Sequence, residues 1–147
     1  MRREGVIRVG NLPNKGANHG VYIGRAWRGV PGSPLGNPRV VGSRRPGGGT
    51  WTAGATLPHY ERELRAALDR SVERASWGGR LLTGAEREAL RAAMNEIYRR
   101  ARDGEHVVLD CHCKPRASTA AQSAEHPCHG DVVARLIMEA LARRKRR

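Results

Sequence analysis

The segment that most constrains the fold runs from residue 105 to residue 141. An apolar run at residues 106–111 predicts a buried strand, and Pro-Cys-His-Gly-Asp at residues 127–131 opens a stretch with helical periodicity. A buried strand that leads through a loop into a helix is typical of α/β proteins. We therefore expect a small Rossmann-like layered α/β domain, with a short, mostly parallel sheet flanked by about three helices.

Two more strands are predicted nearer the start of the chain. Short runs rich in β-branched residues lie at residues 5–10 and 21–25, and both are bounded by turn-forming residues. Residues 39–41 could hold a fourth strand. The order of the strands in the sheet does not follow from these patterns.

Residues 29–54 predict a long loop, because glycine and proline occur there at high density. Within it, residues 33–38 read Ser-Pro-Leu-Gly-Asn-Pro, and the two prolines favour one definite shape that could present the Ser33 hydroxyl and the Asn37 amide to a ligand. Residues 44–49 contain nothing that would hold them, so we expect a flexible tip.

A first helix is predicted to start at Thr56, a plausible N-cap followed by a proline in the tolerated first turn. Residues 76–79 would end it. The apolar side chains that recur every fourth residue, and that should pack on the sheet, are Tyr60, Leu64, Leu68 and Val72.

A second helix is predicted from the capping-box spacing of Thr83 and Glu86 to a stop at residues 103–104. The last helix is predicted over residues 131–142. The apolar stripes that should face the core are Leu90, Met94, Ile97 and Ala101 in the second helix, and Val132, Val133, Leu136, Ile137, Ala140 and Leu141 in the last.

The length and charge of the chain limit its organisation and partners. At 147 residues we expect one domain over residues 1–142, followed by a basic tail at residues 143–147. The formal net charge of +13 makes anionic small molecules and nucleic acids natural partners. A terminal basic run is more often a solvated tail than a nucleic-acid arm.

No apolar stretch approaches the roughly 18 residues that a membrane span requires, so we expect a cytoplasmic protein with no membrane partner. In a reducing compartment, an odd number of cysteines favours thiols or metal ligands over a disulfide framework, and this chain has 3.

A ligand site is expected outside the carboxyl ends of the strands, where loops lead into helix N-termini. The start of the last helix would attract an anion, and Arg25 or Lys114 could add a charged contact to it. This predicts a nucleotide or another phosphorylated small molecule as the ligand. The alternative is that Asp131 only caps its own helix. Candidate ligand-binding residues are Asn11, Tyr22, Gly24, Arg25, Ser33, Leu35, Gly36, Asn37, Cys111, Cys113 and Gly130.

The sulfur-containing residues leave three possibilities open. A structural zinc would use Cys111, Cys113, Cys128 and His129, although the Cys-x-Cys and Cys-His spacings are not those of a usual zinc knuckle. Thiols without a metal are the favoured interpretation. A reactive Cys128, with its thiolate stabilised beside a helix start, is the third. An enzyme of this kind would be a transferase or hydrolase with Cys128, His129 and Asp131 as candidate catalytic residues.

Several of these segments, taken together, resemble a known family. Tyr-Ile-Gly-Arg at residues 22–25, the motif at residues 33–38, Leu-Asp-Cys-His-Cys-Lys-Pro at residues 109–115 and Cys-His-Gly-Asp-Val-Val at residues 128–133 resemble the uncharacterised bacterial and phage family called domain of unknown function 4326. The resemblance covers nearly the whole chain. It implies a small Rossmann-like protein and supplies no reaction; nucleotide-related ligands follow only by analogy of fold.

The chain departs from the family pattern in the sulfur-rich segment. The family usually carries an aromatic residue between the first two cysteines, where this chain has His112, and residues 116–126 lengthen the connection to the Cys-His pair. A long connection argues against a rigid metal knuckle. The alternatives to a nucleotide-binding domain are a basic nucleic-acid-binding accessory protein, with or without zinc, and a phage protein that contacts a host partner and has no ligand.

Overall fold

The computed structural model describes residues 5, 7–11, 20–26, 31–111 and 128–146, with only the backbone for residues 10, 11 and 111. In chain order the elements are β1 (Ile7–Asn11), β2 (Val21–Tyr22), α1 (Ala53–Leu68), β3 (Ser76–Trp77), β4 (Arg80–Leu81), α2 (Gly84–Arg102), β5 (Val107–Cys111) and α4 (His129–Lys145).

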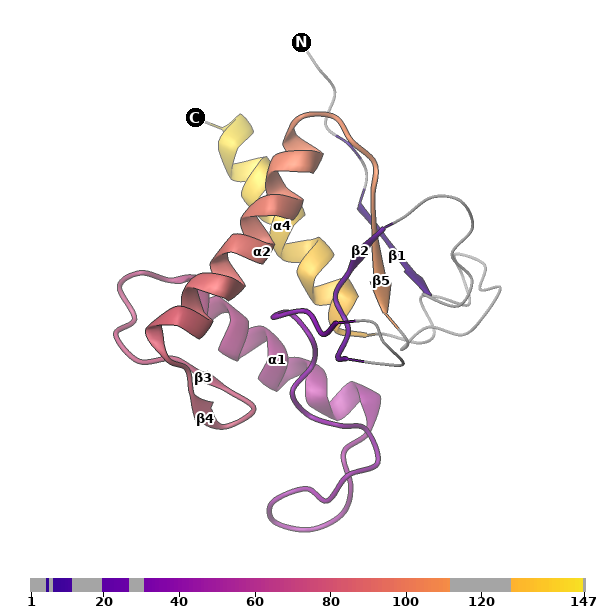
Figure 1. Cartoon of the computed structure of the whole chain (residues 1–147), viewed down its shortest axis with the longest axis vertical. Helices are drawn as coiled ribbons and strands as arrows, with labels where there is room; N and C mark the ends of the chain where they lie inside the picture. Colours follow the sequence, from indigo (N-terminus) through magenta and orange to yellow (C-terminus); the bar gives the residue numbers. More distant parts are fainter. Residues whose placement is uncertain (1–4, 6, 12–19, 27–30, 112–127, 147) are drawn as a thin grey trace.

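Among the described residues, the main sheet contains 3 strands in the order β1-β5-β2, and β5 runs parallel to both neighbours. Helices α2 and α4 lie against one face of this sheet, and α1 packs on both helices (Figure 1). Val107 and Leu109 of β5 are buried on the helix side, because alternate side chains of a strand point to the same face. The expectation of a small α/β domain with a short, mostly parallel sheet is confirmed.

The strands differ from the predicted ones in extent. β1 is shifted toward Asn11, and β2 stops at Tyr22, although the Ile23 N–H still donates to the Asp110 carbonyl at 2.9 Å. The fourth strand suggested for residues 39–41 is wrong: this segment pairs with no strand in the part of the chain that the structure describes, and Val40 and Val41 are exposed. Three β-branched or long side chains in a row are a weak signal without a neighbouring strand to pair with.

Helix α1 begins earlier than predicted. Thr52 is its N-cap, and its hydroxyl accepts the Ala55 N–H at 3.2 Å, so Pro58 lies inside the helix. Thr56 is instead buried, where its hydroxyl donates to the Ala53 carbonyl at 2.9 Å. Both threonines are acceptable caps by residue type, and the tertiary contact of Thr56 selects Thr52 as the cap.

The predicted end of α1 was also wrong. The helix stops at Leu68, so Val72 is not on its apolar face. Residues 76–79, which were expected to end the helix, instead belong to an antiparallel hairpin of β3 and β4 that spans residues 76–81. Gly78 and Gly79 occupy its turn with φ values of 64° and 83°, as the two central residues of a type I′ turn require. Two adjacent glycines therefore indicated a hairpin and not a helix stop.

Helix α2 matches its prediction. The Thr83 hydroxyl accepts the Glu86 N–H at 3.1 Å, the Glu86 carboxylate accepts the Thr83 N–H at 3.0 Å, and Asp103 caps the other end. Its predicted stripe of Leu90, Met94, Ile97 and Ala101 is buried.

Helix α4 is longer than predicted at both ends. It starts at His129 and continues to Lys145, so Arg143, Arg144 and Lys145 form its last turn, where positive charge complements the helix dipole. Its predicted core residues are buried except for Ala140, which is partly exposed. The helix was therefore predicted to end too early, because the basic residues were assigned to a tail although Arg and Lys are good helix formers.

The loop before α1 is tied to the rest of the protein. The Ser33 N–H donates to the Gly24 carbonyl at 2.9 Å, and the Tyr60 hydroxyl donates to the carbonyl of the fully buried Leu35 at 2.7 Å. Further along, a bridge between Arg44 and Thr50 and backbone hydrogen bonds around it hold residues 42–51 in a hairpin-like turn. The prediction that nothing holds residues 44–49 was wrong.

Glu63 of α1 joins three segments. Its carboxylate accepts a hydrogen bond from Arg39 of the loop and the N–H groups of Gly78 and Gly79 of the hairpin turn, the latter two at 3.0 Å each. Burial alone would raise the pKa of Glu63, but these hydrogen bonds lower it below the ordinary value. The carboxylate therefore stays charged and holds the loop and the hairpin against α1.

Within the part of the chain that the structure describes, no helix combines the length and the apolar character needed to cross a membrane.

Candidate functional site

The carboxyl ends of the three parallel strands meet at one edge of the sheet. Asn11 of β1 lies opposite Cys111 of β5 in the register, and Tyr22 of β2 lies opposite Asp110. The N-terminus of α4 lies at this edge, together with the chain that leaves β2 (Figure 1). Segments far apart in the sequence therefore converge where α/β proteins commonly bind ligands.

Gly130 allows α4 to begin in close contact with the sheet. A Cβ atom at this residue would lie 2.9 Å from Val9 Cγ1 and 3.1 Å from Ile23 Cδ1. These distances are shorter than ordinary van der Waals contact, so any larger residue would push the helix away. The missing side chain of Gly130 thus serves packing between helix and sheet, and a role in letting a ligand approach the backbone stays a prediction.

His129 is the best-defined polar group at the helix start. Its side chain is 2% exposed, its Nε2 atom lies 2.8 Å from the Ile23 carbonyl oxygen, and its ring packs edge-on against Tyr60 with centroids 5.3 Å apart. A carbonyl oxygen only accepts, so Nε2 carries the proton and donates.

The environment of His129 keeps the imidazole neutral. Burial is the largest cause that lowers its pKa, and the nearby positive charge of Arg25 lowers it further. The hydrogen bond to Ile23 and the negative charge of Asp131 oppose this shift without reversing it. With the proton on Nε2, the Nδ1 atom of the neutral ring has acceptor character.

Asp131 caps the helix to which it belongs. Its Oδ2 atom accepts the Cys128 N–H at 2.8 Å, three residues upstream. The interpretation of Asp131 as a helix-capping residue is therefore confirmed, and its catalytic role stays a prediction. Cys128 is 3% exposed, which favours the interpretation of a buried thiol over that of a readily accessible nucleophile.

The loop at residues 33–37 uses its polar groups inside the protein. The Ser33 hydroxyl accepts the Leu35 N–H at 3.1 Å, and the Asn37 amide donates to the Thr56 hydroxyl at 3.0 Å. The Asn37 side-chain oxygen also accepts the Arg39 N–H at 3.1 Å. These contacts give the loop the definite shape predicted for it, and they engage the two side chains that were expected to face a ligand.

The segment after β2 packs closely on the same loop. A Cβ atom on Gly36 would lie 3.1 Å from the carbonyl of Gly24, and one on Gly24 would lie 2.5 Å from the Tyr22 hydroxyl. The Tyr22 hydroxyl donates to the Arg25 carbonyl, while the Arg25 side chain is exposed. Arg25 is thus the predicted ligand-binding residue whose charged group is accessible.

Asp110 is a candidate that the sequence prediction omitted. It is 2% exposed and lies one residue before the end of the central strand β5. A Cβ atom on Gly20 would lie 2.5 Å from Asp110 Oδ2, so the chain entering β2 passes directly over this carboxylate. The signal in the sequence was a single acidic residue inside an apolar run. Burial of a charged group there is unfavourable unless the group is paired or hydrogen-bonded.

A groove of about 780 Å³ lies beside the start of α4, between α4 and α1. Glu61 stands in it and accepts hydrogen bonds from Arg135 and Arg65, which lower its pKa to about 2. Through these contacts Glu61 links α1 to α4. The residues that line the groove are Gly54, Leu57, Pro58, Glu61, Arg62, Arg65, Asp131, Val132 and Arg135.

The zinc interpretation falls largely outside the described residues. Cys113 lies in a segment that is not described. For Cys111, and for the candidate ligand-binding residue Asn11, the backbone is described but the side chain is not. Within the described ranges, no three His, Cys, Asp or Glu side chains are grouped so that they could hold a metal ion. Of the four predicted ligands, the structure places Cys128 and His129, and both are buried.

Comparison with known proteins identifies the family. The family model described as domain of unknown function (DUF4326) matches residues 11–139, which is most of the chain, so the protein belongs to this family. No curated protein matches the chain, and no solved structure does.

Proposed function

We propose that this family member binds a nucleotide or another phosphorylated small molecule at the carboxyl edge of its parallel sheet. The observation that carries the proposal is the start of α4: it is fixed at this edge by Gly130, next to the exposed Arg25. Backbone N–H groups and the positive end of a helix dipole favour a bound anion.

The proposal assigns different sides of the ligand to different segments. The anionic part lies at residues 129–130 of α4 and at the Arg25 guanidinium. The polar side chains of Ser33 and Asn37 form hydrogen bonds within the protein. Residues 33–37 therefore contact the base or sugar side of the ligand through shape and not through side-chain hydrogen bonds. Asn11, at the end of β1, is proposed to contact the sugar or its equivalent.

Turnover is the second part of the proposal. His129 is the proposed acid or base for a substitution at a glycosidic or phosphate bond. Cys128 follows as a nucleophile only if its buried thiol becomes accessible when the ligand binds. The proposed activity is therefore that of a transferase or hydrolase acting on a nucleotide-like substrate.

Native mass spectrometry of the purified protein is the first test, because it reports a retained small molecule or a zinc ion directly. Titration calorimetry with inorganic phosphate, ribose 5-phosphate, AMP and ATP then gives the ligand class. We expect Arg25→Ala to weaken binding of the best probe by about tenfold or more, the loss expected for a charge-assisted hydrogen bond.

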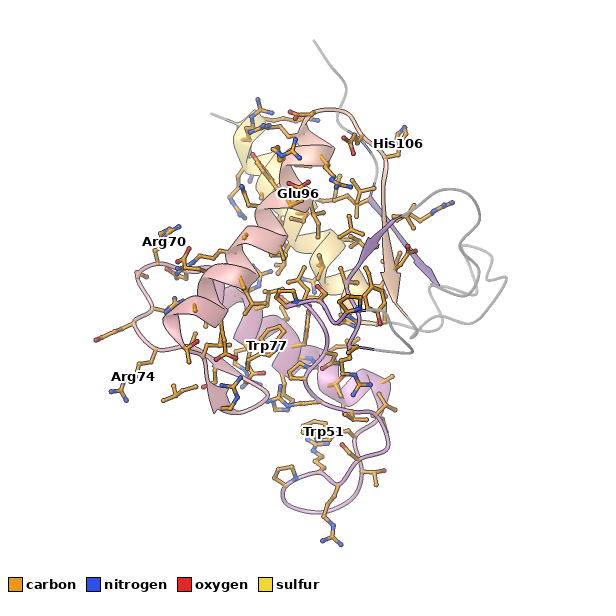
Figure 2. The ribbon with its side chains drawn as sticks, viewed as in Figure 1. Trp51, Arg70, Arg74, Trp77, Glu96 and His106 are labelled. Atoms are coloured by element: carbon orange, nitrogen blue, oxygen red, sulfur yellow. The ribbon has the colours of Figure 1, made fainter. Side chains whose placement is uncertain are left out.

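The matched control is Arg74→Ala, an exposed arginine that Figure 2 places on the turn after α1, across the helices from the sheet. It removes the same charge and should leave the affinity unchanged. If none of the phosphorylated probes binds, or if both variants bind like the unaltered protein, the proposed function is wrong.

A further inference from the structure

A second charged surface lies away from the sheet edge, where the loop before α1 meets the first turns of that helix. Its centre is Trp51, which Figure 2 shows at the base of the projecting loop. We call this surface the arginine–tryptophan cluster, and it consists of Arg39, Arg45, Trp51, His59 and Arg62.

Trp51 holds two guanidinium groups in place. The Cζ atom of Arg45 lies 4.7 Å from the centroid of the Trp51 ring, and that of Arg39 lies 5.5 Å from it. His59 meets the same ring edge-on at 5.2 Å. These partners cover the indole, which is 8% exposed. Long arginine side chains on a surface usually lose entropy when they bind an anion, and stacking on the ring reduces that loss.

The pKa of His59 is lowered in part by the positive charges of this surface. Arg62 Nη2 lies 3.1 Å from His59 Nδ1, and a guanidinium can only donate, so Nδ1 accepts and the ring is neutral. Burial lowers the pKa of His59, and the charges of Arg39, Arg62 and Arg45 lower it further. Glu63 opposes them, but its carboxylate is already bound to Arg39.

The turn beyond the cluster projects from the body of the protein (Figure 1). Arg44 and Arg45 start it, both are exposed, and three glycines follow with φ values of 90°, 115° and 74° at Gly47, Gly48 and Gly49. A Cβ atom at any of these glycines would meet nothing within 4 Å. The turn is therefore narrow, basic and free of side chains that would block a close approach to another surface.

We propose that the exposed arginines of the arginine–tryptophan cluster and of the turn at residues 44–49 bind the phosphate backbone of duplex nucleic acid without reading its sequence. Arg39, which is paired with Glu63, supports the cluster from inside. The charges are spread along a projecting turn instead of converging on one enclosed pocket, which fits a row of phosphates better than a single small anion. Because Trp51 is covered by its own arginines, it is not available to stack on unpaired bases. This surface is separate from the sheet edge and does not depend on the nucleotide proposal.

The test is fluorescence anisotropy with a labelled DNA duplex of about 20 base pairs and mixed sequence, measured between about 50 and about 200 mM salt. The variant is Arg44→Ala combined with Arg45→Ala, two exposed side chains of the projecting turn. Each lost phosphate contact lowers the log–log salt slope by about 0.9, so the double variant should lose about 1.8. Its affinity at the lowest salt should fall about tenfold or more.

The matched control combines Arg70→Ala with Arg74→Ala, which removes the same charge from the turn after α1, far from Trp51 in Figure 2. It should bind the duplex nearly like the unaltered protein. The proposal is overturned if the unaltered protein does not bind the duplex at about 50 mM salt, or if both double variants lose affinity equally. It is also overturned if only Arg143→Ala with Arg144→Ala weakens binding, because the contact then lies at the end of α4.

A second readout follows the His59 ring by NMR. Phosphates beside the cluster would offset the charges that lower the pKa of His59, so duplex binding should raise that pKa; an unchanged value in the saturated complex contradicts the proposal. The nucleotide proposal is tested separately: AMP should bind the Arg44→Ala, Arg45→Ala variant normally, and Arg25→Ala should bind the duplex normally.

Discussion

Helices α2 and α4 begin with the same hydrogen-bond arrangement in opposite environments. In α2 the Glu86 carboxylate accepts the N–H of Thr83 at 3.0 Å, and in α4 the Asp131 carboxylate accepts the N–H of Cys128 at 2.8 Å. The first helix start is exposed to solvent, whereas the second is buried against the sheet. The comparison shows that capping alone does not distinguish a structural helix start from a candidate site; burial and neighbouring segments do.

The glycine near each start gives the largest expected contrast. Gly130→Ala places a methyl group 2.9 Å from Val9 Cγ1, and overpacking of this kind costs about 1–3 kcal/mol. Gly84→Ala in α2 meets nothing within 4 Å and should be neutral or stabilise the protein by up to about 1 kcal/mol. Urea denaturation of the two variants measures the difference. Equal effects would mean that the two helix starts are packed alike.

Removal of the His129 hydrogen bond should have the next largest effect. His129→Leu fills the buried site with an apolar side chain but leaves the Ile23 carbonyl without this donor. The free energy of unfolding should fall by about 1–3 kcal/mol. His59→Leu, at a partly exposed residue, is the control and should cost less. Chemical denaturation of both variants checks the order, and a larger loss for His59→Leu would contradict the hydrogen bond assigned to His129.

The two capping carboxylates should differ less. Asp131→Ala and Glu86→Ala each remove an acceptor for an N-cap N–H, for which the expected loss is about 1 kcal/mol. We expect Asp131→Ala to cost more, because water can replace the carboxylate at the exposed α2 start but less readily at the buried one. Thermal unfolding of the pair measures this, and the reverse order would show that solvent reaches the start of α4.

The smallest expected effect is a pH dependence of stability that comes from His129. Its pKa is lower in the folded protein than the ordinary value of 6.5, so the unfolded chain binds more protons below that pH. The stabilising effect of the neutral ring is complete above about pH 6.5 and decreases as the pH falls. Comparing the unfolding free energy of the unaltered protein and His129→Leu at pH values from about 7 to about 5 tests this, since the variant should show a flatter profile.

The parts of the fold that the sequence predicted correctly depend on local signals. Thr83 and Glu86 supply both halves of a capping box, and the α2 stripe repeats at helical spacing, so neither needed information from elsewhere in the chain. The start of α1 could not be chosen this way. Thr52 and Thr56 are equally acceptable caps, and the contact between Thr56 and Asn37, 19 residues away in sequence, decides between them.

The candidate site was predictable in location but not in the use of its residues. Strand–loop–helix order placed the start of α4 near the strand ends, as observed. The sequence could not show that Gly130 serves packing, or that the amide of Asn37 is used inside the loop. Those assignments depend on which surfaces meet, and a single sequence carries no distances between segments.

The three hydrogen bonds to Glu63 have a consequence for how the protein opens. The loop that carries Arg39 and the hairpin turn at Gly78 and Gly79 do not depend on each other through any strand pairing, yet both are held by the same carboxylate. We therefore expect them to exchange their amide protons in step, as one cooperative opening unit, although they are far apart along the chain. The projecting basic turn would then share its fluctuations with the β3–β4 hairpin.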